Sequence, residues 1–374
     1  MGALEDYVDS FAGTDGYLNW AAFGPLSPAA RTALIADAER QADGRPAALA
    51  AVWAREGEAR RGLAGLLGAA EDDISLHSAS GPALQHAFAG LSGHVVCSTA
   101  EFPSITVALA RAAEASRGAL VPRWIRPAEA VVTAAAVRDA LDDDVTALAV
   151  SHVDFRTGHR ADLAALREAL GPDRLLIVDA VQSFGVVAED WALADVVVGH
   201  GYKWLRAGRG TGFARFAPSA RERIAPVLSG FAGTSAAAYF ADVIPDPAPT
   251  GRAYAVSSPD PLAAGRLAAA VSETAAAGVG AVARRVEERV DAVLDVLDRH
   301  RVPVVSPRDP ARRAGVVALA PRDPAGLGGV LADAGITATV RDGRVRFGVH
   351  AGTGEPTVAL LDDALATAAE FISA

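Results

Sequence analysis

Short apolar runs alternate with longer Ala-rich stretches through the first two thirds of the chain. Residues 146–150, 175–178 and 194–198 are apolar at nearly every position, which is typical of strands buried on both faces. Stretches such as 55–67 and 104–115 separate these runs and have helical spacing. The alternation predicts an α/β fold, with a mostly parallel sheet sandwiched by helices and ligands bound at the carboxyl ends of the strands.

The pattern changes near residue 230. Residues 230–261 are rich in Gly, Pro, Ala and Ser, and two long helical patterns follow at 262–278 and 279–299. From residue 302 on, short strands alternate with helices. We therefore expect a large domain over 16–255 and a small α+β domain formed by 1–15 and 256–374.

Charged and amide side chains follow two of the predicted strands. Asp179 ends one apolar run and Gln182 comes three residues later, while Lys203 follows the next run. A Lys and an Asp at neighbouring strand ends suit pyridoxal phosphate, because the Lys can form a Schiff base and the Asp can keep the pyridine nitrogen protonated. The glycine-rich segment 208–212 lies between this Lys and a strand, so it does not fit a dinucleotide-binding turn.

The blocks VDAVQSFG at 178–185 and YKWL at 202–205 resemble the class V branch of the fold-type I pyridoxal-phosphate enzymes, such as cysteine desulfurases and kynureninases. The resemblance covers nearly the whole chain. It implies a sheet of the seven-stranded type, Lys203 and Asp179 as catalytic residues, and Gln182 in contact with the phenolic oxygen of the cofactor.

The same resemblance implies further cofactor contacts. Ser80 and Gly81 stand at the turn that binds the phosphate, His200 and Tyr202 share that anion, and Phe102 stacks on the ring. His152 lies at a strand end near the ring. Members of the family are usually homodimers, and by that analogy Phe231 and Ser258 reach the cofactor of the partner subunit.

On the substrate side, the segment 344–350 is similar to the family strand whose Arg receives the α-carboxylate, and this role falls on Arg346. Asn19 is expected near the substrate, with Arg156 and Arg341 as possible second contacts. An external aldimine and a Cα carbanion follow, and the resemblance favours an aminotransferase or a C–S or β-lyase. A kynureninase-like hydrolase and a non-catalytic pyridoxal-phosphate-binding protein remain as alternatives.

The cysteine content narrows the choice among these reactions. The only cysteine is Cys97, in a predicted strand, whereas desulfurases carry a persulfide cysteine on a loop near the C-terminus. Sulfur transfer through a persulfide is therefore not expected. A single cysteine also excludes an intramolecular disulfide.

Composition bounds the remaining possibilities. The 374 residues are 51% hydrophobic and carry a formal net charge of −10, which argues against nucleic acid as a partner. The histidines lack the spacing of metal ligands. No stretch is long and uncharged enough to cross a membrane, and the N-terminus does not have the order of a signal peptide, so a cytoplasmic location is expected.

Overall fold

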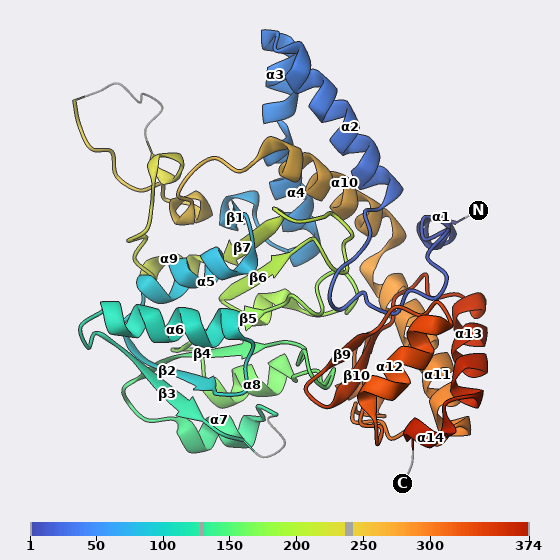
Figure 1. Ribbon diagram of the computed structural model, residues 1–374. Helices are drawn as coiled ribbons and strands as arrows, with labels where there is room; N and C mark the ends of the chain where they lie inside the picture. The colour runs from blue at the N-terminus through green and yellow to red at the C-terminus, as the bar shows by residue number, and fades with distance from the viewer. Residues whose placement is uncertain (1, 128–130, 236–241, 373–374) are drawn as a thin grey trace.

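The computed structural model describes residues 2–127, 131–235 and 242–372, and its centre is a seven-stranded sheet with the order β1-β7-β6-β5-β4-β2-β3 (Figure 1). β7 is antiparallel to β1 and β6, and the other neighbours are parallel. The strands are β1 (Ile74–His77), β2 (Gly93–Ser98), β3 (Leu120–Ile125), β4 (Val145–Ser151), β5 (Leu175–Asp179), β6 (Val196–His200) and β7 (Gly212–Phe216). The predicted fold is confirmed, and the strands predicted at 146–150, 175–178 and 194–198 lie within two residues of β4, β5 and β6.

Helices cover both faces of this sheet because successive strand residues point to opposite sides. Leu175 and Ile177 pack with the helices of one layer, whereas Leu176 and Val178 pack with those of the other. The first layer contains α5 (Ser80–Ala89), α6 (Pro103–Ala115) and α9 (Pro218–Arg223); the second contains α4 (Arg55–Leu67), α7 (Ala134–Ala140), α8 (Leu163–Leu170) and α10 (Pro261–Ala277).

Two N-terminal helices were not expected from the sequence. α2 (Pro28–Asp43) begins after Ser27, whose Oγ accepts a hydrogen bond from the Ala30 N–H, and it ends at Gly44 with φ of 66°. α3 (Pro46–Trp53) follows at once. A Ser directly before a Pro and a Gly after the last turn are helix-boundary signals that were available in the sequence.

The C-terminal elements form a second core next to the sheet (orange to red in Figure 1). α1 (Ala3–Asp9) contributes Tyr7 to this core, so the two ends of the chain pack together. A three-stranded antiparallel sheet with the order β8-β10-β9 lies inside it. The elements are β8 (Val316–Leu319), β9 (Thr339–Arg341), β10 (Arg344–Gly348), α11 (Val279–Arg299), α12 (Pro324–Asp333), α13 (Glu355–Ala366) and α14 (Ala369–Ile372).

The segment that carries Lys203 is tied to this C-terminal sheet. The ring of Trp204 packs on Gly315 so closely that a Cβ atom added there would lie 2.9 Å from it and 2.5 Å from the Val349 carbonyl oxygen. His350 accepts a hydrogen bond at Nδ1 from the Ala351 N–H (2.7 Å), so its Nε2 carries the proton and donates to the Trp204 carbonyl oxygen (2.8 Å). The neutral imidazole thus joins the end of β10 to the lysine segment.

None of the helices in the described part of the chain combines the length and apolar character needed to span a bilayer.

Replacing Phe347 by Ala tests the packing of the C-terminal core. Phe347 is fully buried in β10, so we expect a loss of about 3 to 5 kcal/mol in the free energy of unfolding, measured by urea denaturation. Val340→Ala on neighbouring β9, where the side chain is 45% exposed, should change it by less than about 0.5 kcal/mol. Equal losses in the two variants would contradict this description of the core.

His350→Gln tests the neutral histidine. Burial lowers the pKa of His350 to about 3, so the unfolded chain takes up its proton first as the pH falls. The stability supplied by His350 is complete above pH 6.5 and is lost as the pH falls from there toward 3. The difference in unfolding free energy between wild type and His350→Gln should therefore shrink at low pH, by up to about 1.4 kcal/mol per pH unit. Parallel curves in urea denaturation at pH 7, 6 and 5 would rule the linkage out.

Candidate active site

Two adjoining cavities open at the carboxyl ends of β5 and β6. The larger, of about 460 Å³, lies between the sheet and the β9–β10 hairpin, and the smaller reaches down to Asp179 and Ser80. Both cavities are lined by Phe102, Phe155, Gln182, Tyr202 and Lys203. Most of the site residues predicted from the sequence are therefore brought together in one place.

Lys203 and Asp179 are both buried in this site. Burial lowers the pKa of Lys203 to about 8; Asp179 opposes this effect, and the charges of Arg346 and Arg209 add to it. Burial raises the pKa of Asp179 to about 6, against the N–H of Val181, which donates to Oδ1 at 2.8 Å, and the charge of Lys203. The pair consists of an amine that loses its proton readily and a carboxylate beside it.

Gln182 has a fixed orientation. Its Oε1 accepts a hydrogen bond from the indole N–H of Trp204 (3.0 Å), and its Nε2 donates to the carbonyl oxygen of Ala21 (3.0 Å). An indole N–H can only donate, so the amide cannot be reversed without losing both bonds. Nε2 has a second hydrogen, and Gln182 lines both cavities, so this donor is available to a ligand.

A set of donors surrounds the deep end of the smaller cavity. His200 stacks on Tyr202 with ring centroids 3.8 Å apart, and its buried Nδ1 has no hydrogen-bond partner among the described residues. Ser80, the first residue of α5, lines the same cavity. Gly81 follows, with open space where a Cβ atom would lie. A helix N-terminus, a hydroxyl and an unpartnered imidazole together form a cradle for an anion.

Phe102 and Phe155 form the aromatic wall. They meet edge to face with centroids 5.0 Å apart, and Phe102 is 38% exposed toward the cavities. His152 is not among the lining residues: it is fully buried, with Nδ1 2.9 Å from the Ser183 hydroxyl and Nε2 3.0 Å from a carboxylate oxygen of Glu189. It therefore supports the strand end from behind.

Arg346 lies on the opposite wall, on β10. Its Nη1 donates to the Phe155 carbonyl oxygen (2.7 Å), its Nη2 lies 3.5 Å from the Thr339 hydroxyl, and its buried Nε has no partner among the described residues. Asn19 stands one step behind, since its Oδ1 accepts a hydrogen bond from Thr339 (2.7 Å). Arg156 lines the cavity too, but Asp154 already holds its guanidinium at 2.7 Å.

Three of the residues discussed from the sequence lie away from these cavities. Phe231 is 57% exposed, and Ser258 lines a different surface cavity beside Arg252. Neither contributes to the site of its own chain in the described structure, and the prediction that they act across a dimer stays untested. Cys97 is fully buried inside β2, and burial raises the pKa of its thiol well above the usual value.

Sequence reasoning missed two residues that shape the site. Trp204 was noted only as part of the lysine block, although it orients Gln182. Glu101 was not considered; its Oε2 accepts the Ser151 N–H at 3.1 Å, and burial raises its pKa to about 7. The signal for Glu101 was a carboxylate directly before the aromatic residue at a strand end.

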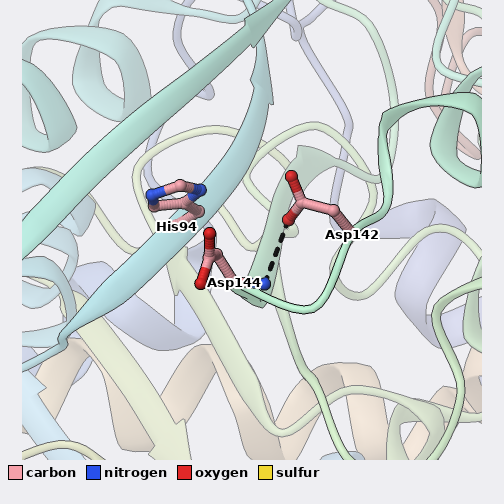
Figure 2. A group of neighbouring side chains, drawn as sticks. All are labelled: His94, Asp142 and Asp144. Atoms are coloured by element: carbon pink, nitrogen blue, oxygen red, sulfur yellow. Dashed lines mark hydrogen bonds between the residues drawn. The ribbon is translucent and has the colours of Figure 1, made fainter.

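Figure 2 shows the group His94, Asp142 and Asp144, whose donor atoms lie within 4.8 Å of one another. It stands where β2 and β4 begin, at the edge of the sheet opposite to the cavities. Asp142 accepts the Asp144 N–H and forms an ion pair with Arg123, so its charge is already matched. We assign no metal to this group.

The cavities fit pyridoxal phosphate on four counts. A reactive amine, a buried carboxylate for the ring nitrogen, an oriented amide and an anion cradle with an unpartnered imidazole surround one space, and an aromatic side chain covers it. Each corresponds to one functional group of that cofactor.

Comparisons with known proteins point the same way. The family model described as "Aminotransferase class-V" matches residues 49–346. Kynureninase from Burkholderia mallei is 27% identical over 175 residues, which is 43% of this chain and 40% of that protein. Kynureninase from Deinococcus radiodurans is 36% identical over 117 residues, or 30% of this chain and 26% of that protein. The matched part thus spans less than half of the length of these curated relatives.

Among solved structures, the apo cysteine desulfurase from Thermococcus onnurineus NA1 has a TM-score of 0.84 at 19% identity, covering 100% of this chain and 98% of that one. The cystine C–S lyase C-DES in complex with its product, cysteine persulfide, gives the same score and identity over 96% and 98% of the two chains. These likenesses establish the fold. The family match and the residues around Lys203 lead to the conclusion that this chain belongs to the class V aminotransferase family, whose cofactor is pyridoxal phosphate.

Proposed function

We propose that the protein is a pyridoxal-phosphate-dependent enzyme that acts on an amino acid, as an aminotransferase or as a C–S or β-lyase. The observation that carries the proposal is the burial of Lys203 and Asp179 in one cavity with the unpartnered His200. Pyridoxal phosphate supplies an electron sink for the bonds around Cα. The protein residues then have separate tasks of binding, orientation and proton transfer.

Lys203 would hold the cofactor covalently through its amine, and the same amine, when free, would be the base that takes the Cα proton of the substrate. Its lowered pKa of about 8 leaves a larger neutral fraction at pH 7 than an ordinary lysine has. Asp179 keeps the ring nitrogen protonated, and the second N–H of Gln182 Nε2 binds the phenolic oxygen. His200, Tyr202 and Ser80 bind the phosphate.

The substrate α-carboxylate binds Arg346. A guanidinium held by two neutral oxygens, with one nitrogen unsatisfied, is ready to receive an anion. Asn19 positions Thr339 and thereby Arg346, whereas the ion pair with Asp154 makes Arg156 a weaker contact.

The choice among reactions is supported by the cysteine and by the relatives. Cys97 is buried with a raised thiol pKa, so this chain lacks an accessible persulfide carrier among its own side chains. A lyase cleaves the C–S bond without such a group, and the structural neighbours include a cystine C–S lyase whose reaction product is cysteine persulfide.

A kynureninase-like hydrolase is the second candidate, favoured by the curated relatives and by the aromatic wall of Phe102 and Phe155. A homodimer with shared sites and a cytoplasmic location complete the proposal.

Lys203→Ala tests the proposal directly, because Lys203 is the only lysine in the sequence. Wild type should show the visible absorption band of bound pyridoxal phosphate, and borohydride reduction should attach the cofactor to the peptide that contains Lys203. The variant should lose the band, the reduced adduct and at least about 10³-fold of the activity. A band in Lys203→Ala, or none in cofactor-loaded wild type, would refute the cofactor assignment.

The same spectra, recorded with a panel of amino acids, are combined with an analysis of the products, which separates the possible reactions. A 2-oxo acid with the carbon skeleton of the added amino acid indicates an aminotransferase. Pyruvate with sulfide from L-cysteine, or pyruvate with cysteine persulfide from L-cystine, indicates a lyase. Anthranilate from kynurenine indicates the hydrolase. A band that no amino acid changes indicates a non-catalytic binding protein.

Trp204→Phe tests whether Trp204 orients Gln182. The change removes the N–H that holds Oε1, so the amide can turn and its remaining donor is misplaced. We expect the pH midpoint of the visible band to shift, with a shift of the same sign in Gln182→Leu. The double variant should show no more than the larger single shift. Additive shifts would mean that the two residues act independently.

A further inference from the structure

The β9–β10 hairpin presents a row of arginines to the larger cavity. Its register places Arg344 opposite Arg341, and Arg346 opposite Thr339. Side chains at alternate positions of a strand share one face, and directly opposed residues share it as well. All four residues line the cavity of about 460 Å³.

These arginines differ in how their charges are matched. Among the described residues, no hydrogen bond or ion pair involves the half-buried guanidinium of Arg344. Arg341 contacts only the carboxylate of adjacent Asp342, at 3.1 Å, and both side chains are more than 70% exposed. An exposed ion pair of this kind contributes little. Arg346 has two neutral oxygen partners and no carboxylate.

On the side of the larger cavity formed by the β9–β10 hairpin, the positive charge exceeds the negative charge. Arg156 is matched by Asp154 on the opposite side, and Asp342 is the single carboxylate among the residues that line the larger cavity. Arg344 and Arg346 therefore remain as two cations without anionic partners.

The two cations stand at different depths. Arg346 and Lys203 line the same cavity, and Arg346 is close enough for its charge to lower the pKa of that amine. Arg344 lies two residues toward the hairpin turn, a separation of about 7 Å along the strand. Two flexible arginine side chains at this spacing can each reach one of two acidic groups of the same small molecule.

We propose that Arg344, assisted by Arg341, is a second anion subsite, and that the substrate is an amino acid with an acidic side chain, such as a carboxylate or a sulfinate. The inference rests on the proposed function, because it takes Arg346 as the contact for the α-carboxylate. It adds the substrate class: the side chain of the substrate points from Lys203 toward the turn of the hairpin.

Matched pairs of amino acids test the charge without changing the shape. The loaded wild-type protein is titrated with L-aspartate and L-asparagine, with L-glutamate and L-glutamine, and with L-cysteine sulfinate. The readout is the concentration that half-converts the visible band. In at least one of the two pairs, the acid should act at about 10- to 100-fold lower concentration than its amide. This is the effect of one charge-assisted contact. The better of the acids identifies the preferred side chain.

Arg344→Gln should remove this preference, leaving acid and amide within about threefold of each other, while the values for the amides change little. Arg322→Gln is the matched control: it removes the same charge from an exposed arginine that contacts only the Glu370 carbonyl oxygen, and the preference should persist. Persistence of the preference in Arg344→Gln would overturn the assignment of the subsite.

A binding measurement that involves no reaction separates the two proposals. Glutarate has two carboxylates and pentanoate has one, and neither has an amine. Glutarate should raise the Tm of wild type more than pentanoate does, and Arg344→Gln should abolish the difference. If neutral amino acids convert the band as well as acidic ones and glutarate gives no advantage, the anion subsite is wrong and the proposed function stands. If no amino acid changes the band, both are wrong.

Discussion

The structure is organised around two opposite charges, those of Asp179 and Lys203, buried in one cavity just beyond the ends of neighbouring strands. Removing two ions from water costs several kcal/mol for each, and their attraction offsets this cost only when further contacts are well placed. The N–H of Val181, which donates to Asp179, is such a contact. The core on both faces of the sheet, with fully buried Ile177 and Val178, keeps the strand ends in register.

The scarcity of lysine has a chemical consequence. The chain carries its positive charge on arginine at every position except 203. Guanidinium groups remain protonated and do not condense with aldehydes under ordinary conditions, whereas a neutral amine does. An aldehyde cofactor therefore meets one reactive side-chain amine in the whole molecule, and that amine is the one whose pKa burial lowers.

Much of the sheet and of the cofactor site could be predicted from the sequence, because both depend on local signals. The apolar runs that end in Asp179 or lead to Lys203 mark strand ends by themselves, and the strands predicted at 175–178 and 194–198 lie within two residues of β5 and β6. The N-terminal helices were not predicted, although Ser27 and Gly44 mark the ends of one of them.

Contacts between distant segments could not be predicted. Trp204 and Gln182 meet only because β5 and β6 are adjacent, and no periodicity reports which group of an amide will face an indole. Arg156 was expected to contact the substrate, but it forms an ion pair with Asp154. The two residues are close in the sequence, yet only the turn around 154–157 brings their charged groups together. The register that aligns Arg344 with Arg341 likewise depends on the hairpin.

The close packing of Trp204 on Gly315 constrains how the molecule can move. The indole fills the space above the Gly315 backbone, and the carbonyl oxygen of the same Trp204 accepts a hydrogen bond from His350. Any displacement of the C-terminal part relative to the main sheet must carry the lysine segment with it or break these contacts. The end of β10 and the segment that carries the reactive amine are therefore held to each other, and Arg346 ties the Phe155 side of the cavity to the same strand.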